Sequence, residues 1–272
     1  MKKTSVRGFV NANNDLIGSV FVKNTSKVTY RKKLASLLFL MRLFIYRLYA
    51  TLFLIFAEPI LVLSQLQLRR SGGLAGPYQF HRLLEIRRTI KKKTLATGIE
   101  FGSGASSILF VKYLYKFISI EESHQWKNSY LENISILRYL RPKFFAKIEK
   151  SILVFERTEY LDSSGHLVCS YRLPNSIIND KFDLAYVDGP TALVQSERPA
   201  VGTVVDPFGY LPNVSLLELI VLPTYIMVDG RRATLVHLLR NLESKNYDFS
   251  LKGSYLEKPR VNPYHSTFTS SM

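Results

Sequence analysis

The chain has 272 residues and a formal net charge of +16, with 47% hydrophobic and 21% charged residues. This composition excludes disorder over most of the chain, because enough large apolar residues are present to form a core. A disulfide-rich secreted scaffold is also excluded, since Cys169 is the only cysteine. The first long apolar stretch begins at Leu34, too late for a signal peptide, and we expect a cytoplasmic protein.

Positive charge is concentrated in the N-terminal third. Residues 1–93 hold 18 Lys and Arg against three acids, whereas the other 179 residues hold 19 basic and 18 acidic groups. Such asymmetry indicates a polyanionic partner, either a membrane or a nucleic acid. Nucleic acid is disfavoured because no recognised motif accompanies the basic residues. Within this region, residues 5–10 and 16–22 are predicted to form a β-hairpin.

Residues 34–64 form an apolar segment interrupted by Arg42, Arg47 and Glu58. The longest uncharged run, 48–57, is ten residues, whereas spanning a bilayer takes roughly 20. Basic residues flank both ends, as is typical of a helix that lies on an anionic membrane, and we favour that interpretation. Two alternatives remain open: a helix packed on the folded domain or on a second copy, and a true membrane span.

A turn-rich linker over 71–77 suggests a boundary between an N-terminal leader, 1–76, and a domain, 77–272. From Tyr78 onward, helices and strands are predicted to alternate. Alternation of this kind gives an α/β fold with a Rossmann-like, mostly parallel sheet covered by helices on both faces, here with a basic and apolar helical leader. Helices are predicted over 79–91, from the glycine-rich turn at 102–107 through Leu114, and over 125–140, 214–221 and 234–244. Strands are predicted over 94–101, 116–121, 148–156, 182–188 and 225–229.

The most informative stretch surrounds a glycine-rich turn. A predicted strand ends at Glu100, Gly102 and Gly104 follow, and the next strand ends at Glu121. Glycines let a backbone approach a ligand closely, and the N-terminus of the following helix offers unpaired N–H groups. An acid at the end of the second strand can accept both hydroxyls of a ribose. The sequence therefore predicts a site for an adenosine-type nucleoside.

Two ligands carry such a nucleoside. A dinucleotide fingerprint requires a third glycine where this chain has Ser107, and its pyrophosphate would lie near the negative charge of Glu100. S-adenosylmethionine has no phosphate, and its ammonium and sulfonium groups tolerate a carboxylate. We therefore favour S-adenosylmethionine over NAD.

Three segments resemble class I S-adenosylmethionine-dependent methyltransferases. They are Glu100-Phe101-Gly102-Ser103-Gly104, the strand that ends at Glu121, and Phe182-Asp183-Leu184-Ala185-Tyr186-Val187-Asp188-Gly189-Pro190; Tyr225–Asp229 resembles the fifth strand. One departure is Ser106, where many members have a third glycine. The cofactor-binding residues that the resemblance implies are Glu100, Gly102, Ser103, Gly104, Glu121 and Asp188.

Asp188 is the candidate catalytic residue, because an acid that ends the fourth strand faces the reacting end of the ligand; the alternative is a structural acid that caps the next turn. We expect no metal. Mg²⁺ held by Asp188 and Asp229 remains an open alternative, as does pairing of those acids with Arg231 or Arg232.

Other positions carry weaker expectations. His81 is a candidate base or ligand contact, and His124 and Trp126 are candidates for the adenine site, each with a plain surface or core role as the alternative. The long loop over 191–213 is expected to select the acceptor. Cys169 is predicted to be buried rather than nucleophilic.

We interpret the chain as an S-adenosylmethionine-dependent methyltransferase that acts on a small-molecule or glycan acceptor at a membrane surface. Its location would be cytoplasmic and peripheral on the inner face of the membrane. The alternatives are an NAD-type oxidoreductase and a non-catalytic membrane-associated protein that keeps the fold. A homo-oligomer formed through the apolar leader also remains open.

Overall fold

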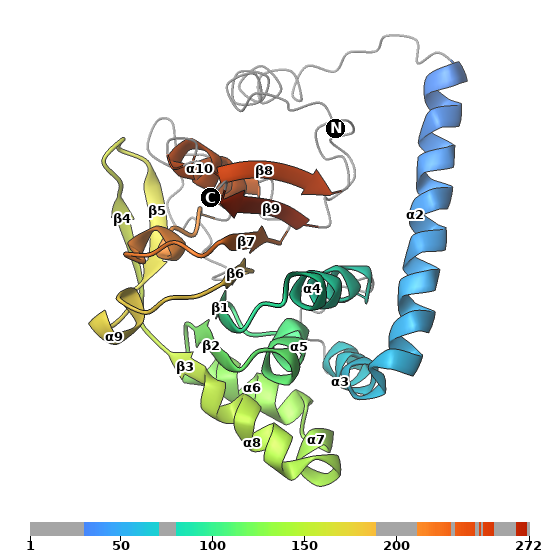
Figure 1. Cartoon of the computed structure of the whole chain (residues 1–272), viewed down its shortest axis with the longest axis horizontal. Helices are drawn as coiled ribbons and strands as arrows, with labels where there is room; N and C mark the ends of the chain where they lie inside the picture. The colour runs from blue at the N-terminus through green and yellow to red at the C-terminus, as the bar shows by residue number, and fades with distance from the viewer. Residues whose placement is uncertain are drawn as a thin grey trace.

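A computed structural model describes most of the chain (Figure 1). The predicted hairpin, the linker and most of the long loop over 191–213 lie outside the described part. The described residues are 30–70, 80–188, 211–229, 232–242, 245, 247–252 and 265–270.

Seven strands form one sheet in the order β3-β2-β1-β6-β7-β9-β8. The first five strands of this order run parallel, and β9 pairs antiparallel with both β7 and β8. This arrangement confirms the expected mostly parallel sheet. The strands are β1 (Thr97–Phe101), β2 (Lys116–Glu121), β3 (Ile152–Val154), β6 (Leu184–Val187), β7 (Tyr225–Val228), β8 (Tyr247–Lys252) and β9 (His265–Ser270).

Two hydrophobic clusters cover opposite faces of the sheet. Side chains of a strand point alternately to its two faces, and β6 follows this rule: Leu184 and Tyr186 join one cluster, Ala185 and Val187 the other. Both faces are therefore buried, as a parallel sheet requires. The described helices of the domain are α4 (Phe80–Lys93), α5 (Ala105–Tyr113), α6 (His124–Asn133), α7 (Ile136–Leu140), α8 (Pro142–Ser151), α9 (Asn175–Ile178) and α10 (Arg232–Leu242). The sequence did not predict α8 and α9 as helices.

Three predicted elements were wrong in type or extent. The helix over 125–140 is interrupted after Asn133 and continues as α7, and the helix over 214–221 is a single 3₁₀ turn, Ser215–Glu218. The strand over 148–156 is instead the end of α8 followed by the short β3. Phe145 and Ile148 are buried at helical spacing, so the apolar residues there belong to an amphipathic helix rather than to a strand.

An antiparallel hairpin was not predicted. It consists of β4 (Arg157–Leu161) and β5 (Leu167–Tyr171), and it forms a separate two-stranded sheet between β3 and β6 in the chain. Its turn contains Gly165 with a φ of 76°, a left-handed conformation that favours glycine. The hairpin contacts the 3₁₀ turn through β5, so it lies beside the segment that leads to β7.

Two helices of the leader pack on the domain. α2 (Tyr30–Ala57) and α3 (Pro59–Arg70) are joined at Glu58 and lie beside the domain (Figure 1). Leu54 and Leu61 are buried in the same hydrophobic cluster as residues of α4 and α5. The proposed boundary after residue 76 therefore does not coincide with a gap in the core. Within the described residues, no single helix is long and apolar enough to cross a membrane; 44–57 and 59–67 meet that test only together, bent by 114°.

Candidate functional site

Four predicted site residues lie at one edge of the sheet. The parallel register places the carboxyl ends of β1, β2, β6 and β7 side by side. Glu100 belongs to the end of β1, Glu121 ends β2, and Asp188 and Asp229 directly follow β6 and β7. Ligands of open α/β sheets bind at this edge, where the loops leave the strands.

The glycine-rich turn has the geometry that its sequence predicts. Gly102 has a φ of 95°, which an L-residue with a side chain rarely adopts, and its N–H donates to the Ile120 carbonyl at 2.8 Å. Gly104 then precedes the first residue of α5, Ala105. The turn therefore presents the N-terminus of α5, with its N–H groups and positive dipole end, at the carboxyl edge of the sheet.

Glu100 lies beneath this turn. Its carboxylate has no solvent exposure and accepts hydroxyl hydrogen bonds from Ser106 at 2.5 Å, Ser107 at 2.5 Å and Ser119 at 2.9 Å. Burial raises its pKa to about 8, against the lowering effect of the three serines. Glu100 thus holds the start of α5 against β2, and its direct contact with a cofactor stays a prediction. The serines at 106 and 107, which depart from glycine-rich patterns, serve this contact.

Replacing Glu100 with glutamine is expected to flatten the pH dependence of stability. The pKa of Glu100 in the folded protein, about 8, exceeds the ordinary value of 4.5. Between these two pH values the folded protein keeps a proton on Glu100 that the unfolded chain has lost. This contribution to stability is full below pH 4.5 and is lost as the pH rises toward 8. Denaturant unfolding between about pH 5 and 9 measures it, because the glutamine side chain does not titrate. Glu132→Gln, at an exposed site, is the control, and equal pH slopes in wild type and Glu100→Gln would contradict the assignment.

Glu121 is positioned to accept hydrogen bonds from a ligand. Its Oε2 accepts the Ser103 N–H at 3.0 Å and the Ser103 hydroxyl at 2.6 Å, while Oε1 accepts the Glu122 N–H at 2.9 Å. Burial raises the pKa of this carboxyl, and the hydrogen bonds oppose the increase. The two backbone donors fix the carboxylate, whereas the Ser103 hydroxyl can rotate away and give its place to a ligand hydroxyl.

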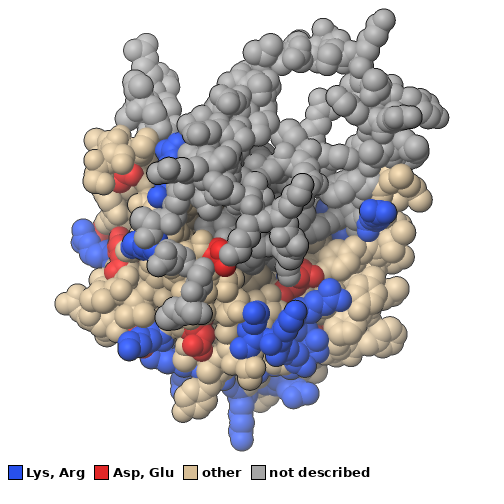
Figure 2. Space-filling view, turned by 45° about the horizontal axis from the view of Figure 1, so that its top comes forward, with Lys and Arg blue, Asp and Glu red and all other residues tan. Residues whose placement is uncertain are grey.

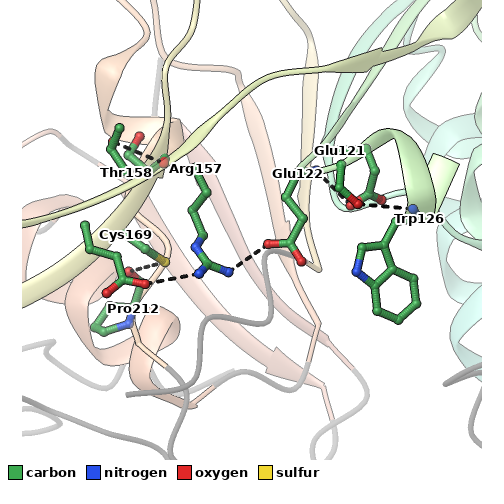
Figure 3. A network of polar contacts seen from close by, with 10 residues as sticks. Glu121, Glu122, Trp126, Arg157, Thr158, Cys169 and Pro212 are labelled. Carbon is green, nitrogen blue, oxygen red and sulfur yellow. Dashed lines mark hydrogen bonds and ion pairs between the residues drawn. The ribbon is translucent and has the colours of Figure 1, made fainter. Parts of the chain in front are cut away.

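The unpredicted hairpin reaches the same region (Figure 3). Arg157, the first residue of β4, forms an ion pair with Glu122 at 2.9 Å and with Glu159 at 3.3 Å. Trp126, in the first turn of α6, lies beside this network and is 46% exposed. Cys169 is fully buried, as predicted, and its thiol donates to the Pro212 carbonyl at 3.3 Å.

A cation from α4 lies at the ends of β6 and β7. Arg82 forms an ion pair with Asp229 at 2.6 Å, and the field of Asp188 also acts on its guanidinium. Burial would lower the pKa of Arg82, but the charges of Asp229, Tyr186 and Asp188 raise it overall. Sequence reasoning missed Arg82; its only signal was a basic residue in the first turn of a helix that leads into β1. Among the described residues, no group of three or more His, Cys, Asp or Glu could hold a metal ion.

The structure does not test the predicted arginine partners of Asp188 and Asp229. Arg231 and the side chain of Arg232 are outside the described part of the chain. Asp188 is half-buried, and its N–H donates to the Phe101 carbonyl at 2.9 Å, which ties the end of β6 to β1. The acid thus lies next to the glycine-rich turn, although its catalytic role stays a prediction.

The histidines separate into different environments. His81 is buried beside Arg82 on α4, whereas His124 is exposed at the start of α6. His166 and His237 approach opposite oxygens of Asp162, with N···O distances of 3.6 and 3.8 Å, a grouping that their spacing in the sequence did not reveal. Burial lowers the pKa of His237, against the raising effect of Asp162. This cluster attaches the hairpin turn to α10.

Comparisons with known proteins find likeness in solved structures alone. No protein-family model matches the chain, and no curated protein sequence matches it. The O-methyltransferase TomG from Streptomyces achromogenes, solved with SAM, is 11% identical over 79% of this chain and 91% of its own, with a TM-score of 0.43. An O-methyltransferase from Bacillus cereus, solved with SAH, is 11% identical over 69% and 79%, with a TM-score of 0.36. The SAH-bound methyltransferase PaMTH1 from Podospora anserina is 12% identical over 71% and 79%, with a TM-score of 0.38.

The sheet itself decides the fold. The parallel strands lie in the order β3-β2-β1-β6-β7, the strands β9 and β8 follow as an antiparallel pair, and the glycine-rich turn comes directly after β1. The chain has an α/β, Rossmann-like fold, as predicted. In this fold the turn after β1 and the acid that ends β2 lie together, as Gly102 and Glu121 do here.

Proposed function

We propose that the protein is an S-adenosylmethionine-dependent methyltransferase. The observation that carries the proposal is the joint geometry of Gly102, Ser103 and Glu121: a left-handed glycine turn whose next residue hydrogen-bonds to the acid that ends β2. This arrangement offers a carboxylate to a ribose and backbone N–H groups to the rest of the ligand. Ser107, whose hydroxyl donates to Glu100, occupies the position where a dinucleotide fingerprint requires its third glycine, which disfavours a pyrophosphate in the same place.

The residues present fit the cofactor. Glu121 would hold the ribose hydroxyls, the turn at Gly102–Gly104 would approach the methionine part, and Trp126 offers an exposed ring near the end of β2 for the adenine. When bound, S-adenosylmethionine supplies an electrophilic methyl group. The protein aligns the acceptor nucleophile with that methyl group. Asp188 is the residue proposed to remove the proton of the nucleophile.

We propose a small-molecule or glycan hydroxyl as the acceptor, reached at a membrane surface from the cytoplasmic side. A hydroxyl needs a nearby base, and Asp188 follows β6 between the cofactor turn and Asp229. Arg82 already supplies a positive charge to Asp229, so a magnesium ion is not part of the proposal. The guanidinium of Arg82 can also orient an anionic group of the acceptor.

Calorimetric titration with S-adenosylmethionine, S-adenosylhomocysteine and NAD tests the cofactor. We expect the first two to bind with micromolar affinity and NAD not to bind. Binding of NAD alone would favour the oxidoreductase interpretation. If none of the three binds, the chain keeps the fold without the cofactor, and the proposed function is wrong.

A further inference from the structure

One face of α2 is apolar and exposed. Its eight large apolar side chains are 41–85% exposed, and at 100° per residue they fall within an arc of about 120°. With roughly 200 Å² of surface per large side chain, they leave on the order of 900 Å² uncovered, more than the largest apolar patch of a typical monomer. We call this surface the α2 face; it consists of Leu38, Met41, Phe44, Ile45, Leu48, Leu52, Ile55 and Phe56.

The opposite side of α2 packs on the domain. Ala50 and Leu54 are fully buried, and α2 contacts α4. Arg88 of α4 donates to the hydroxyls of Tyr46 at 3.2 Å and Tyr49 at 3.4 Å. The α2 face therefore points away from the protein core. The contacts of the opposite side of α2 with α4 fix the direction in which the α2 face points.

A buried ion-pair network locks the bend between α2 and α3. Glu58, 3% exposed, accepts from Arg87 at 2.7 Å and also contacts Lys112 and the Tyr113 hydroxyl. Arg87 belongs to α4, and Lys112 and Tyr113 lie at the end of α5, the helix that begins at the glycine-rich turn. The direction of the α2 face is thus tied to the candidate site rather than free to swing on a linker.

Charge decides which partner fits the α2 face. Residues 30–93 contain 13 Lys and Arg and only two acids, Glu58 and Glu85, both of which form ion pairs within the protein. Arg42 and Lys91–Lys93 are exposed, and Figure 2 shows basic side chains gathered on the lower part of one face of the molecule. A second copy of this chain would bring two basic surfaces together, whereas an anionic bilayer attracts them.

We propose that the α2 face lies in the headgroup–acyl boundary of an anionic lipid bilayer, with α2 parallel to the membrane plane. An interfacial helix buries one apolar face there, and basic residues at its sides contact anionic headgroups. The Glu58 network then holds the carboxyl edge of the sheet in a set orientation to the bilayer. This inference deepens the membrane-surface part of the proposed function by naming the surface and the lipid charge.

Co-sedimentation of the full chain with vesicles tests the inference. Vesicles of phosphatidylcholine alone are compared with vesicles that contain about 30% phosphatidylserine. We expect binding to the anionic vesicles, weakened by high salt, and a loss of roughly tenfold or more in Phe56→Glu. Tyr115→Glu is the matched control, because its ring is 90% exposed and that of Phe56 is 85% exposed, but it lies outside the α2 face.

A second measurement reports the position of the helix directly. Cys169 is fully buried, so a polarity-sensitive fluorophore reacts with an introduced cysteine in Leu52→Cys or Tyr115→Cys. We expect a blue shift on anionic vesicles at position 52 and none at position 115. Equal shifts, equal partitioning of the two glutamate variants, or no vesicle binding would overturn the inference.

The remaining outcomes are also decisive. A wild-type dimer in light scattering that Phe56→Glu dissociates would assign the α2 face to a second copy instead. S-adenosylhomocysteine binding is measured in the same samples, and we expect Phe56→Glu to retain it. If the ligand fails to bind while the vesicle results hold, the methyltransferase proposal fails and the membrane surface stands.

Discussion

Replacing Glu121 with alanine is expected to weaken S-adenosylhomocysteine binding by roughly 10- to 100-fold, since a hydrogen bond to a charged group contributes about 1.5–3 kcal/mol. The carboxylate is held by the N–H groups of Ser103 and Glu122, so it does not have to be ordered when the ligand binds. Calorimetric titration of the variant and the wild type measures the difference.

The neighbouring acid provides the control. The Glu122 side chain points away from Glu121 and forms its ion pair with Arg157 of the hairpin, so Glu122→Ala is expected to change affinity far less (Figure 3). Equal losses in the two variants would show that the acid that ends β2 does not hold the ligand. Because Glu121 also organises Ser103, a thermal unfolding curve of Glu121→Ala shows whether the turn has remained folded.

Replacing Glu58 with alanine is expected to lower the free energy of unfolding by about 3–5 kcal/mol, the cost of breaking a buried ion pair by removing one partner. The substitution leaves Arg87 without its carboxylate at a site where that arginine is 14% exposed. Lys112 is 43% exposed and can turn to solvent, which places the expected loss toward the lower end of this range. Urea denaturation measures the change.

An exposed ion pair sets the scale for comparison. Glu156 and Arg172 are 67% and 72% exposed, so Glu156→Ala is expected to cost less than about 1 kcal/mol.

The contribution of Glu58 to stability also depends on pH. Burial raises the pKa of Glu58, but Lys112, Tyr113 and Arg87 lower it overall. Its contribution is therefore present above the ordinary pKa and is lost as the pH falls through the lowered value. If Glu58→Ala unfolds like Glu156→Ala, the bend between α2 and α3 is not held by this network.

The sequence predicted the parts of the site that are local in the chain. Gly102 and Gly104 follow a buried strand within a few residues, and Glu121 ends the next one, so turn chemistry and strand ends were enough to place them. The same reasoning misread 148–156, because a short apolar run fits both a strand and the end of an amphipathic helix, and only packing of Phe145 and Ile148 decides between them.

Contacts between distant residues depended on the tertiary structure. Arg82 and Asp229 are 147 positions apart, and Arg157 reaches Glu122 only because the hairpin packs beside the end of β2. The burial of Glu100 under three serines likewise needs α5 and β2 to be packed together.

The N-terminal leader shows most clearly what the sequence predicts and what only the tertiary structure decides. Its sequence established an apolar helix with basic flanks, but α2 is apolar on two sides, and periodicity cannot tell which side a protein core will cover. Packing against α4 buries Ala50 and Leu54 and leaves Leu48, Leu52 and Phe56 outside. The chain alone therefore determined the elements and the local chemistry of the turn. The tertiary structure decided which charges meet and which apolar face remains for a partner, because burial is a property of the whole assembly of elements.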